Sequence, residues 1–209
     1  MRTSRTFKLL ANVCRLILAC TFILSGFTKV IDPWGTALKV NEYLSIYGME
    51  ALEPASMTFS IWLCGAELMM GCMLLFKVRI RLISIFALAS MLFFTLLTLL
   101  SATVIPVEDC GCFGDAVKLT PWETFAKNLV LLPLSVVVWW RYRRDRIFAF
   151  SKAEVGCTVL FFSLAMGLGI YCYAHLPLID FRPFKVGVNI YEAMNAYSAD
   201  PGPQAGRRG

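Results

Sequence analysis

Five stretches of apolar residues, each close to the length of a membrane-spanning helix, constrain this chain more than any other feature. A helix needs about 20 mostly apolar residues to cross a bilayer, and in lipid only helices and closed barrels satisfy their own backbone hydrogen bonds. Hydrophobic residues make up 58% of the chain and charged residues only 16%, which leaves no room for a soluble domain of ordinary size. The sequence predicts an all-α, polytopic membrane helical bundle with spans at 7–30, 57–76, 82–105, 122–140 and 155–174.

Basic residues between the apolar stretches indicate how the chain is oriented. Lys and Arg close to span ends stay on the cytoplasmic side, and the basic clusters all fall on one side of an odd number of spans. This predicts a multi-pass protein of the bacterial inner membrane with a cytoplasmic N-terminus and a periplasmic C-terminus. The net charge of +6 is explained by these anchors, so the expected partner is the lipid bilayer and not nucleic acid. The clusters are Arg2, Arg5 and Lys8; Lys77, Arg79 and Arg81; and Arg141, Arg143, Arg144 and Arg146.

Two cysteines, Cys110 and Cys112, flank a single glycine in a segment that this topology places outside. Disulfides persist in that compartment, and a disulfide in so small a ring is strained and therefore prone to exchange. We identify these two as the candidate catalytic residues. A static disulfide or inert loop thiols are one alternative. A metal site is another, but two thiolates fill only half of a tetrahedral shell, which His175 or Asp109 would have to complete, and no bound metal is expected.

Local signals also mark two helix starts near the outer surface. The run Thr120-Pro121-Trp122-Glu123 combines a Thr cap, Pro at the first helical position and Glu at the third, which predicts the start of the helix over 122–140. The run Asp32-Pro33-Trp34-Gly35 predicts a turn followed by a short amphipathic helix lying at the membrane interface.

Ionisable residues inside the spans are costly and mark functional sites by default. Glu67 and Lys127 differ in depth by only about 5 Å when counted from the outer ends of their spans, and the long side chain of Arg15 could reach upward to Glu67. The cluster is either an ion pair that fixes helix packing or a proton or quinone headgroup site beneath the cysteines. Lys29 is interpreted as an anchor that extends its ammonium group to the interface, and His175 as an interface residue.

Several short motifs resemble the DoxX/MauE family of small redox-associated membrane proteins, and the CGCFG run is the most specific of them. The resemblance implies a four-helix membrane core over 1–150, to which this chain adds a fifth transmembrane helix over 151–175 and an outward-facing, partly disordered tail over 176–209. The motifs are Arg15-Leu16, Phe22, Ser25-Gly26-Phe27 and Lys29; Glu67 with Gly71; and Cys110-Gly111-Cys112-Phe113-Gly114.

The residues and the resemblance together predict an integral membrane thiol-disulfide redox protein. It would exchange electrons between outer-compartment thiols and the membrane quinone pool, as a thiol:quinone-type oxidoreductase or an accessory subunit of one. The expected partner is a periplasmic thiol or thioredoxin-like protein, and the expected cofactor is quinone, held by Glu67, Lys127 and Arg15. The alternative is a non-enzymatic assembly component or a soft-metal-binding or transport component.

Overall fold

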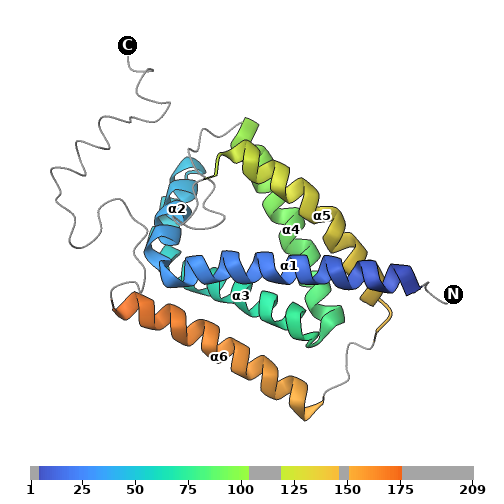
Figure 1. The fold of residues 1–209 in the computed structure, drawn as a ribbon. Helices are drawn as coiled ribbons and strands as arrows, with labels where there is room; N and C mark the ends of the chain where they lie inside the picture. Colours follow the sequence, from blue (N-terminus) through green and yellow to red (C-terminus); the bar gives the residue numbers. More distant parts are fainter. Residues whose placement is uncertain (1–4, 104–118, 146–150, 176–209) are drawn as a thin grey trace, which may run out of the picture.

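The computed structural model describes residues 5–103, 119–145 and 151–175, and within these ranges it contains helices and no strand. The prediction of an all-α fold is confirmed. Cys110 and Cys112, Asp109 and the tail over 176–209 lie outside the described residues. The helices are α1 (Arg5–Ile31), α2 (Pro33–Ile46), the short 3-10 helix η1 (Glu50–Ala55), α3 (Ser56–Phe76), α4 (Ile80–Thr103), α5 (Pro121–Tyr142) and α6 (Lys152–Ala174) (Figure 1).

Four helical segments in the described part of the chain are long and apolar enough to cross a membrane. They are α1, α4, α6 and the continuous segment Ala51–Phe76, which joins η1 to α3. The remaining predicted span, 122–140, also forms a helix, α5, but α5 is not among these four. The chain is therefore a multi-pass membrane protein, as predicted, and four of its five expected spans are supported by length and composition.

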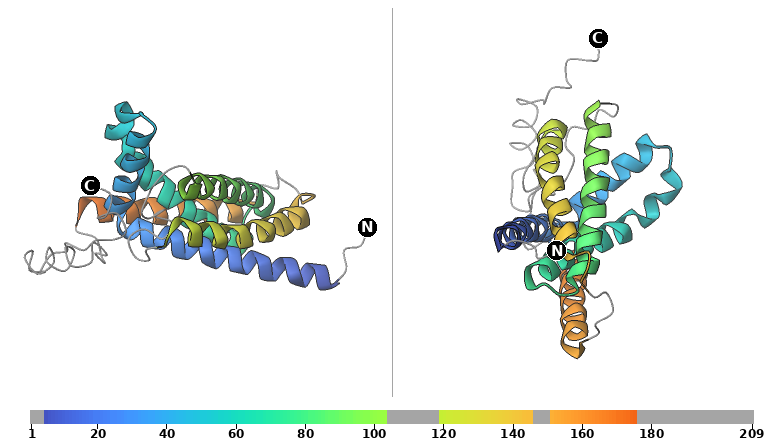
Figure 2. Two further views of the ribbon diagram at one scale, coloured as in Figure 1. Left: turned by 90° about the horizontal axis from the view of Figure 1, so that it is seen from above. Right: turned by 90° about the vertical axis from the view of Figure 1, so that its right-hand side faces the viewer.

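The long helices form two close pairs. α1 runs beside α3, and α4 runs beside α5 (Figure 1). α6 packs chiefly against α3, on the side away from α5, and buries only three residues. α2 stands across the direction of the other helices at one end of the bundle, where Figure 2 shows it projecting from them. The short helix that the sequence predicts after Asp32 is therefore present, and its location at the membrane interface stays a prediction.

Two glycines let α1 and α3 approach each other closely. A Cβ atom added at Gly26 of α1 would lie 2.7 Å from the Cα of Leu68, and one added at Gly71 of α3 would lie 2.7 Å from the backbone nitrogen of Ile23. No side chain fits at either position without moving the partner backbone. Small residues commonly allow such backbone contact between membrane helices, and here they fix how α1 lies on α3.

Side-chain caps fix the starts of α2 and α5, as the sequence predicts. The Asp32 carboxylate accepts a hydrogen bond from the backbone of Gly35 at 3.2 Å. Asp32 is the single residue between α1 and α2. At the start of α5, the Thr120 hydroxyl accepts from the backbone of Glu123, and the Glu123 carboxylate accepts from the backbone of Thr120 at 2.9 Å. Because these signals involve only neighbouring residues, they could be read directly from the sequence.

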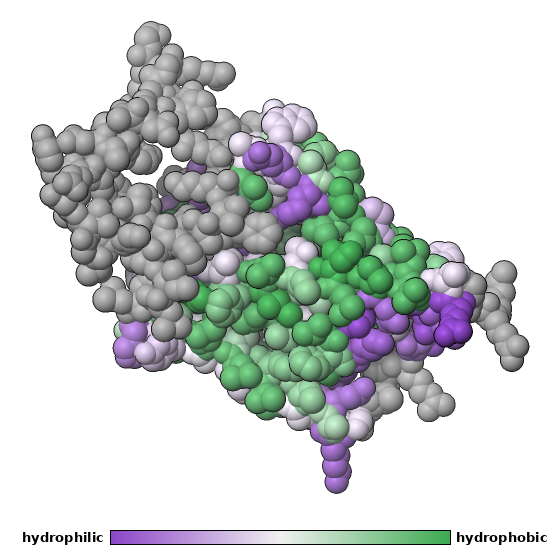
Figure 3. Space-filling view, in the orientation of Figure 1, coloured by the Kyte–Doolittle hydropathy of each residue, from purple (hydrophilic) through white to green (hydrophobic). Residues whose placement is uncertain are grey.

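The described residues of the basic clusters gather at one end of the bundle, where α1 begins, α3 turns into α4, and α5 ends. Arg81 donates to the backbone carbonyl of Asp145 at 2.8 Å, and the Tyr142 hydroxyl donates to the Asn12 side chain at 3.1 Å, which ties these three regions together. Figure 3 shows a strongly hydrophilic group at this end and apolar side chains along the flank. One end of the molecule is thus strongly basic, as the topology prediction requires.

Candidate functional site

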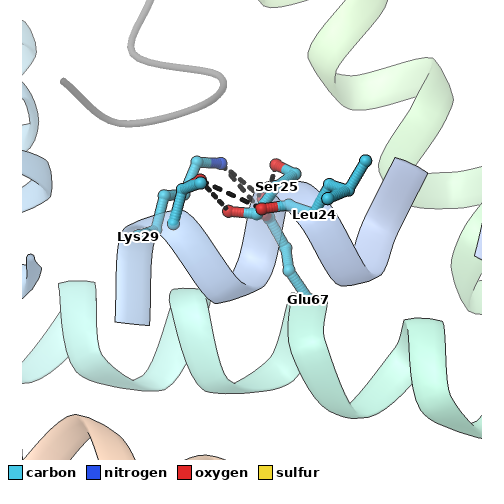
Figure 4. A network of polar contacts seen from close by, with 5 residues as sticks. Leu24, Ser25, Lys29 and Glu67 are labelled. Carbon is cyan, nitrogen blue, oxygen red and sulfur yellow. Dashed lines mark hydrogen bonds and ion pairs between the residues drawn. The ribbon is translucent and has the colours of Figure 1, made fainter. Parts of the chain in front are cut away.

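A buried ion pair joins α1 to α3. The Lys29 ammonium group lies 2.8 Å and 3.0 Å from the two carboxylate oxygens of Glu67, and the two side chains are only 5% and 4% exposed. The Ser25 hydroxyl donates a third hydrogen bond to the same carboxylate at 3.0 Å. Ser25 and Lys29 are four residues apart on α1 and so lie on one face of the helix (Figure 4). The pairing and its hydrogen bonds compensate for burying the charges.

The two glycines explain why Lys29 reaches Glu67. Gly26 lies directly after Ser25 on α1, and Gly71 lies one helical turn after Glu67 on α3. Each glycine touches the backbone of the opposite helix. The close approach of the backbones places the carboxylate within reach of both the hydroxyl and the ammonium group.

A cavity of about 30 Å³ lies beside the ion pair, between α1, α3, α4 and α5. This volume is enough for about one water molecule, which needs roughly 10–15 Å³. Lys127 lines this cavity together with Glu67, so the structure brings two of the three predicted cofactor residues to one place. The lining residues are Thr21, Phe22, Ser25, Lys29, Glu67, Met91, Phe94, Lys127, Asn128 and Leu131.

Arg15, the third predicted cofactor residue, lies elsewhere and does not line this cavity. Its guanidinium group donates to the backbone carbonyls of Leu74 and Leu75, at 2.5 Å and 2.7 Å, in the last turn of α3. Carbonyls in the last turn of a helix have no partner within the helix, so Arg15 acts as a side-chain cap. α3 then ends at Lys77, whose φ of 57° is left-handed.

The structure corrects two details of the predicted charge cluster. The expected partners of Glu67 were Lys127 or Arg15, but the ion pair is formed with Lys29. The interpretation of Lys29 as an anchor reaching the interface is wrong, because its side chain is 5% exposed. The spacing of Ser25, Gly26 and Lys29 on α1 was the signal that could have identified it: two polar residues on one face beside a glycine that permits close contact.

A second cavity, of about 260 Å³, adjoins the first and lies between α2, α3 and α4. Lys29 and Phe94 line both cavities. An apolar, aromatic lining with a few polar groups is typical of small-molecule sites. The lining residues are Lys29, Thr36, Lys39, Val40, Tyr43, Leu44, Tyr47, Met49, Phe59, Leu63, Phe93, Phe94, Leu97 and Thr98. We call this space the α2 cavity.

Polar contacts hold the helices around the α2 cavity together. The hydroxyl groups of Tyr43 on α2 and Ser101 on α4 are 3.1 Å apart, and the Asn128 amide of α5 donates to the Thr98 hydroxyl of α4 at 3.4 Å. The Lys29 ammonium group lies 5.5 Å from the centre of the Phe94 ring. The walls of both cavities are thus fixed by contacts between different helices.

The six cysteines among the described residues are all free thiols. Cys64 is buried, and both charges of the Lys29–Glu67 pair act on it electrostatically. His175 is exposed and stacks on Tyr171 with ring centroids 4.5 Å apart. Within the described ranges no group of three His, Cys, Asp or Glu residues is placed to hold a metal ion. The expectation that Cys110 and Cys112 act chemically stays a prediction.

The fold and this site define a multi-pass helical membrane protein with a lysine–glutamate pair buried between its first and third helices. Residues 7–141 match the family model described as "Methylamine utilisation protein MauE", which covers more than half of the chain. The chain belongs to the MauE family. This confirms the MauE part of the expected resemblance, and the matched range ends within α5, before α6 begins.

A curated relative is also similar to this chain. It is "Protein TlpB" of Flavobacterium psychrophilum, 28% identical over 127 residues, which is 58% of this chain and 34% of the relative. The matching part of the chain thus spans about a third of the relative's length. No solved structure matches the chain.

Proposed function

We propose that this protein is an integral membrane thiol-disulfide redox protein of the MauE family. In this proposal Cys110 and Cys112 exchange a disulfide with thiols of the outer compartment, and the bundle passes the electrons to quinone in the membrane. The observation that carries the proposal is the buried Lys29–Glu67 pair with its adjoining cavities. These cavities reach Thr98, near the end of α4, and Lys127, near the start of α5, and the segment with the two cysteines connects these helix ends.

The proposed topology places that segment outside. The basic end of the bundle faces the cytoplasm by the positive-inside rule, which makes the N-terminus cytoplasmic in a bacterial inner membrane. The end of α4 and the start of α5 then lie on the periplasmic side. A periplasmic thiol protein of the thioredoxin-like kind is the partner that fits this arrangement.

The reaction balances as an exchange between a dithiol and a quinone. Oxidation of the Cys110 and Cys112 thiols to a disulfide forms one S–S bond and releases two electrons and two protons. A quinone held by the bundle would supply the acceptor for both electrons and both protons. Lys29 would donate a hydrogen bond to the quinone, and Glu67, whose carboxylate lies 2.8 Å from the Lys29 ammonium group, would exchange a proton with Lys29. The reverse direction has the same balance.

The residues present fit such a group. Quinone oxygens only accept hydrogen bonds in the oxidised form, and Lys29 offers a cationic donor that lines an apolar, aromatic cavity. Lys127 lines the adjoining cavity and adds a second ammonium group near the carboxylate. Arg15 is assigned a capping role instead, because its guanidinium group donates to two carbonyls at the end of α3.

Thiol trapping of the purified protein in proteoliposomes tests the proposal. We expect Cys110 and Cys112 to change from thiols to a disulfide when decylubiquinone, a short-chain quinone, is added. Cys110→Ser and Cys112→Ser should each abolish the change, whereas Cys157→Ser, in α6, should not. Thiols that keep their state while the purified protein retains a soft metal would instead favour the assembly or metal-binding alternative.

Labelling of intact spheroplasts tests the compartment. A membrane-impermeant thiol reagent applied after mild reduction should modify Cys110 and Cys112. Modification that requires permeabilised membranes would reverse the topology and exclude a periplasmic thiol partner.

A further inference from the structure

We infer that the α2 cavity is the binding site of a quinone headgroup, with Lys29 and Thr36 as its hydrogen-bond donors. The inference rests on the proposed function and assigns it a place. It moves the cofactor site from the predicted set of Glu67, Lys127 and Arg15 to the space enclosed by α2, α3 and α4.

The size and lining of the α2 cavity suit a flat ring. Its volume of about 260 Å³ approaches the range of roughly 300–1,000 Å³ that is usual for small-molecule sites. Aromatic side chains line it: Tyr43 of α2, Tyr47 directly after α2, Phe59 of α3, and Phe93 and Phe94 of α4. Aromatic rings favour offset stacking or edge contacts with another ring, so a flat conjugated headgroup is better matched here than a branched polar one.

The α2 cavity also borders the lipid-facing surface of the bundle. Phe59 of α3 and Phe93 of α4 both line the cavity and are exposed, at 56% and 59%. In a membrane-spanning helix such exposed apolar side chains face lipid. A ligand held in the cavity can therefore leave an isoprenoid tail in the bilayer between α3 and α4, and this requirement suits a lipid-soluble quinone.

Thr36 is a second, independent observation that points to a ligand in the α2 cavity. Its side chain lines the cavity and is 7% exposed, and its hydroxyl oxygen has no hydrogen-bond partner of normal geometry among the described residues. The Cys64 thiol lies near it, but a thiol is a weak hydrogen-bond partner. A buried hydroxyl left without a full partner is destabilising, and a ligand carbonyl in the α2 cavity would accept its hydrogen bond.

Lys29 links the α2 cavity to the proton-exchanging pair. Its ammonium group contacts Glu67, lies 5.5 Å from the centre of the Phe94 ring, and lines both cavities. A headgroup oxygen that accepts a hydrogen bond from Lys29 is therefore separated only by Lys29 from the Glu67 carboxylate. The small cavity beside Glu67 is equally near. The other lysine of the α2 cavity, Lys39, has a side chain that is 25% exposed, whereas the Lys29 side chain is 5% exposed, so the deep cationic donor is Lys29.

A neutral acceptor explains these features better than a phospholipid does. An acyl chain needs no hydrogen-bond donors, so it would leave Thr36 unsatisfied. An anionic headgroup would have to compete with Glu67 and Glu42 for the two lysines. A quinone adds hydrogen-bond acceptors without adding a charge.

Equilibrium binding of decylubiquinone to the full chain in nanodiscs tests the inference. Leu63→Trp places a larger side chain in the α2 cavity and should weaken binding more than tenfold. Thr36→Val keeps the shape and removes the hydroxyl, and should raise the Kd about fivefold, as expected for the loss of one hydrogen bond. Leu164→Trp, at an exposed position of α6 outside the α2 cavity, is the matched control and should leave the Kd unchanged.

Two further measurements make the outcomes decisive. Unchanged binding in both Leu63→Trp and Thr36→Val, with folding verified by size-exclusion chromatography, would overturn the inference. A saturated fatty acid that displaced decylubiquinone as well as a quinone does would also overturn it. The Cys110→Ser, Cys112→Ser double variant separates the inference from the proposed function, because it should bind decylubiquinone normally although it cannot exchange thiols. Conversely, thiol oxidation by quinone that persists in Leu63→Trp would retain the function and reject this site.

Discussion

Two cations of the same helix, Lys29 and Arg15, are both buried against α3 but are neutralised in different ways. Lys29 is paired with a full negative charge, the Glu67 carboxylate. Arg15 instead contacts the partial negative charges of two backbone carbonyls at the end of α3. The two residues are 14 positions apart, which is about 21 Å along a helix at 1.5 Å per residue. A lysine paired with a carboxylate depends on a single partner, and that partner can gain or lose a proton. Backbone carbonyl groups do not titrate, so an arginine bound to them has partners whose charge does not change.

Removing Lys29 should have the largest effect on stability. Lys29→Met leaves the Glu67 carboxylate buried without its cation, and breaking a buried pair in this way costs about 3–5 kcal/mol. Replacing both residues, with Lys29→Met and Glu67→Met together, should restore most of the loss. The measurement is the free energy of unfolding in mixed micelles, and a double variant no more stable than Lys29→Met would contradict the pairing.

Removing Arg15 should cost less and should show no coupling to Glu67. Arg15→Met leaves two carbonyls without their charged donor, and one hydrogen bond to a charged group contributes about 1.5–3 kcal/mol. Combined with Glu67→Met, the two losses should add to within about 0.5 kcal/mol, as for distant sites. A larger coupling energy in this double-mutant cycle would mean that Arg15 interacts with the carboxylate after all.

Widening the contact between α1 and α3 should weaken both regions together. Gly71→Ala forces a methyl group against the backbone of Ile23, and overpacking of this kind costs about 1–3 kcal/mol. Gly167→Ala is the matched control, since a Cβ atom there meets nothing within 4 Å. The same unfolding assay should show a loss for Gly71→Ala alone. Equal stability of the two variants would contradict the close helix approach.

Removing an exposed cap should have the smallest effect. Thr120→Ala deletes the hydroxyl that caps α5, and the loss of such a cap costs about 1 kcal/mol. Thr103→Ala removes a hydroxyl that bonds only to the carbonyl of Leu99 in its own helix, and should change stability less. If Thr120→Ala lowered the free energy of unfolding as much as Arg15→Met does, the buried Arg15 cap would stabilise the protein no more than the exposed Thr120 cap.

The parts of this structure that could be predicted are those set by residues close together in the sequence. The spans follow from the apolar stretches, and the start of α5 follows from Thr120 and Glu123, which are three residues apart. The ion pair could not be assigned in this way. Counting residues gives the depth of Glu67 in its helix, but it does not show which face of α1 turns toward α3. That depends on the contact between Gly26 and Leu68, which are far apart in the chain.

The α2 cavity was also beyond prediction, for a related reason. The sequence indicates a short amphipathic helix after α1, but the enclosed space depends on where α2 lies above α3 and α4. Tyr43 fixes that position by its contact with Ser101, 58 residues away in the chain. The predicted cofactor residues Glu67 and Lys127 do lie near one another, while Thr36 carries no signal until α2 is in position.

The modest hydrophobicity of α5 has a consequence for how the protein enters the membrane. This helix carries Glu123, Lys127 and Asn128 in its first two turns, and it is not among the four segments that are long and apolar enough to cross a membrane. Insertion of a marginal segment is favoured when its polar groups find partners on a neighbour, here Thr98 of α4. We therefore expect the translocon to release α4 and α5 together, as a hairpin, only after both helices have been synthesised.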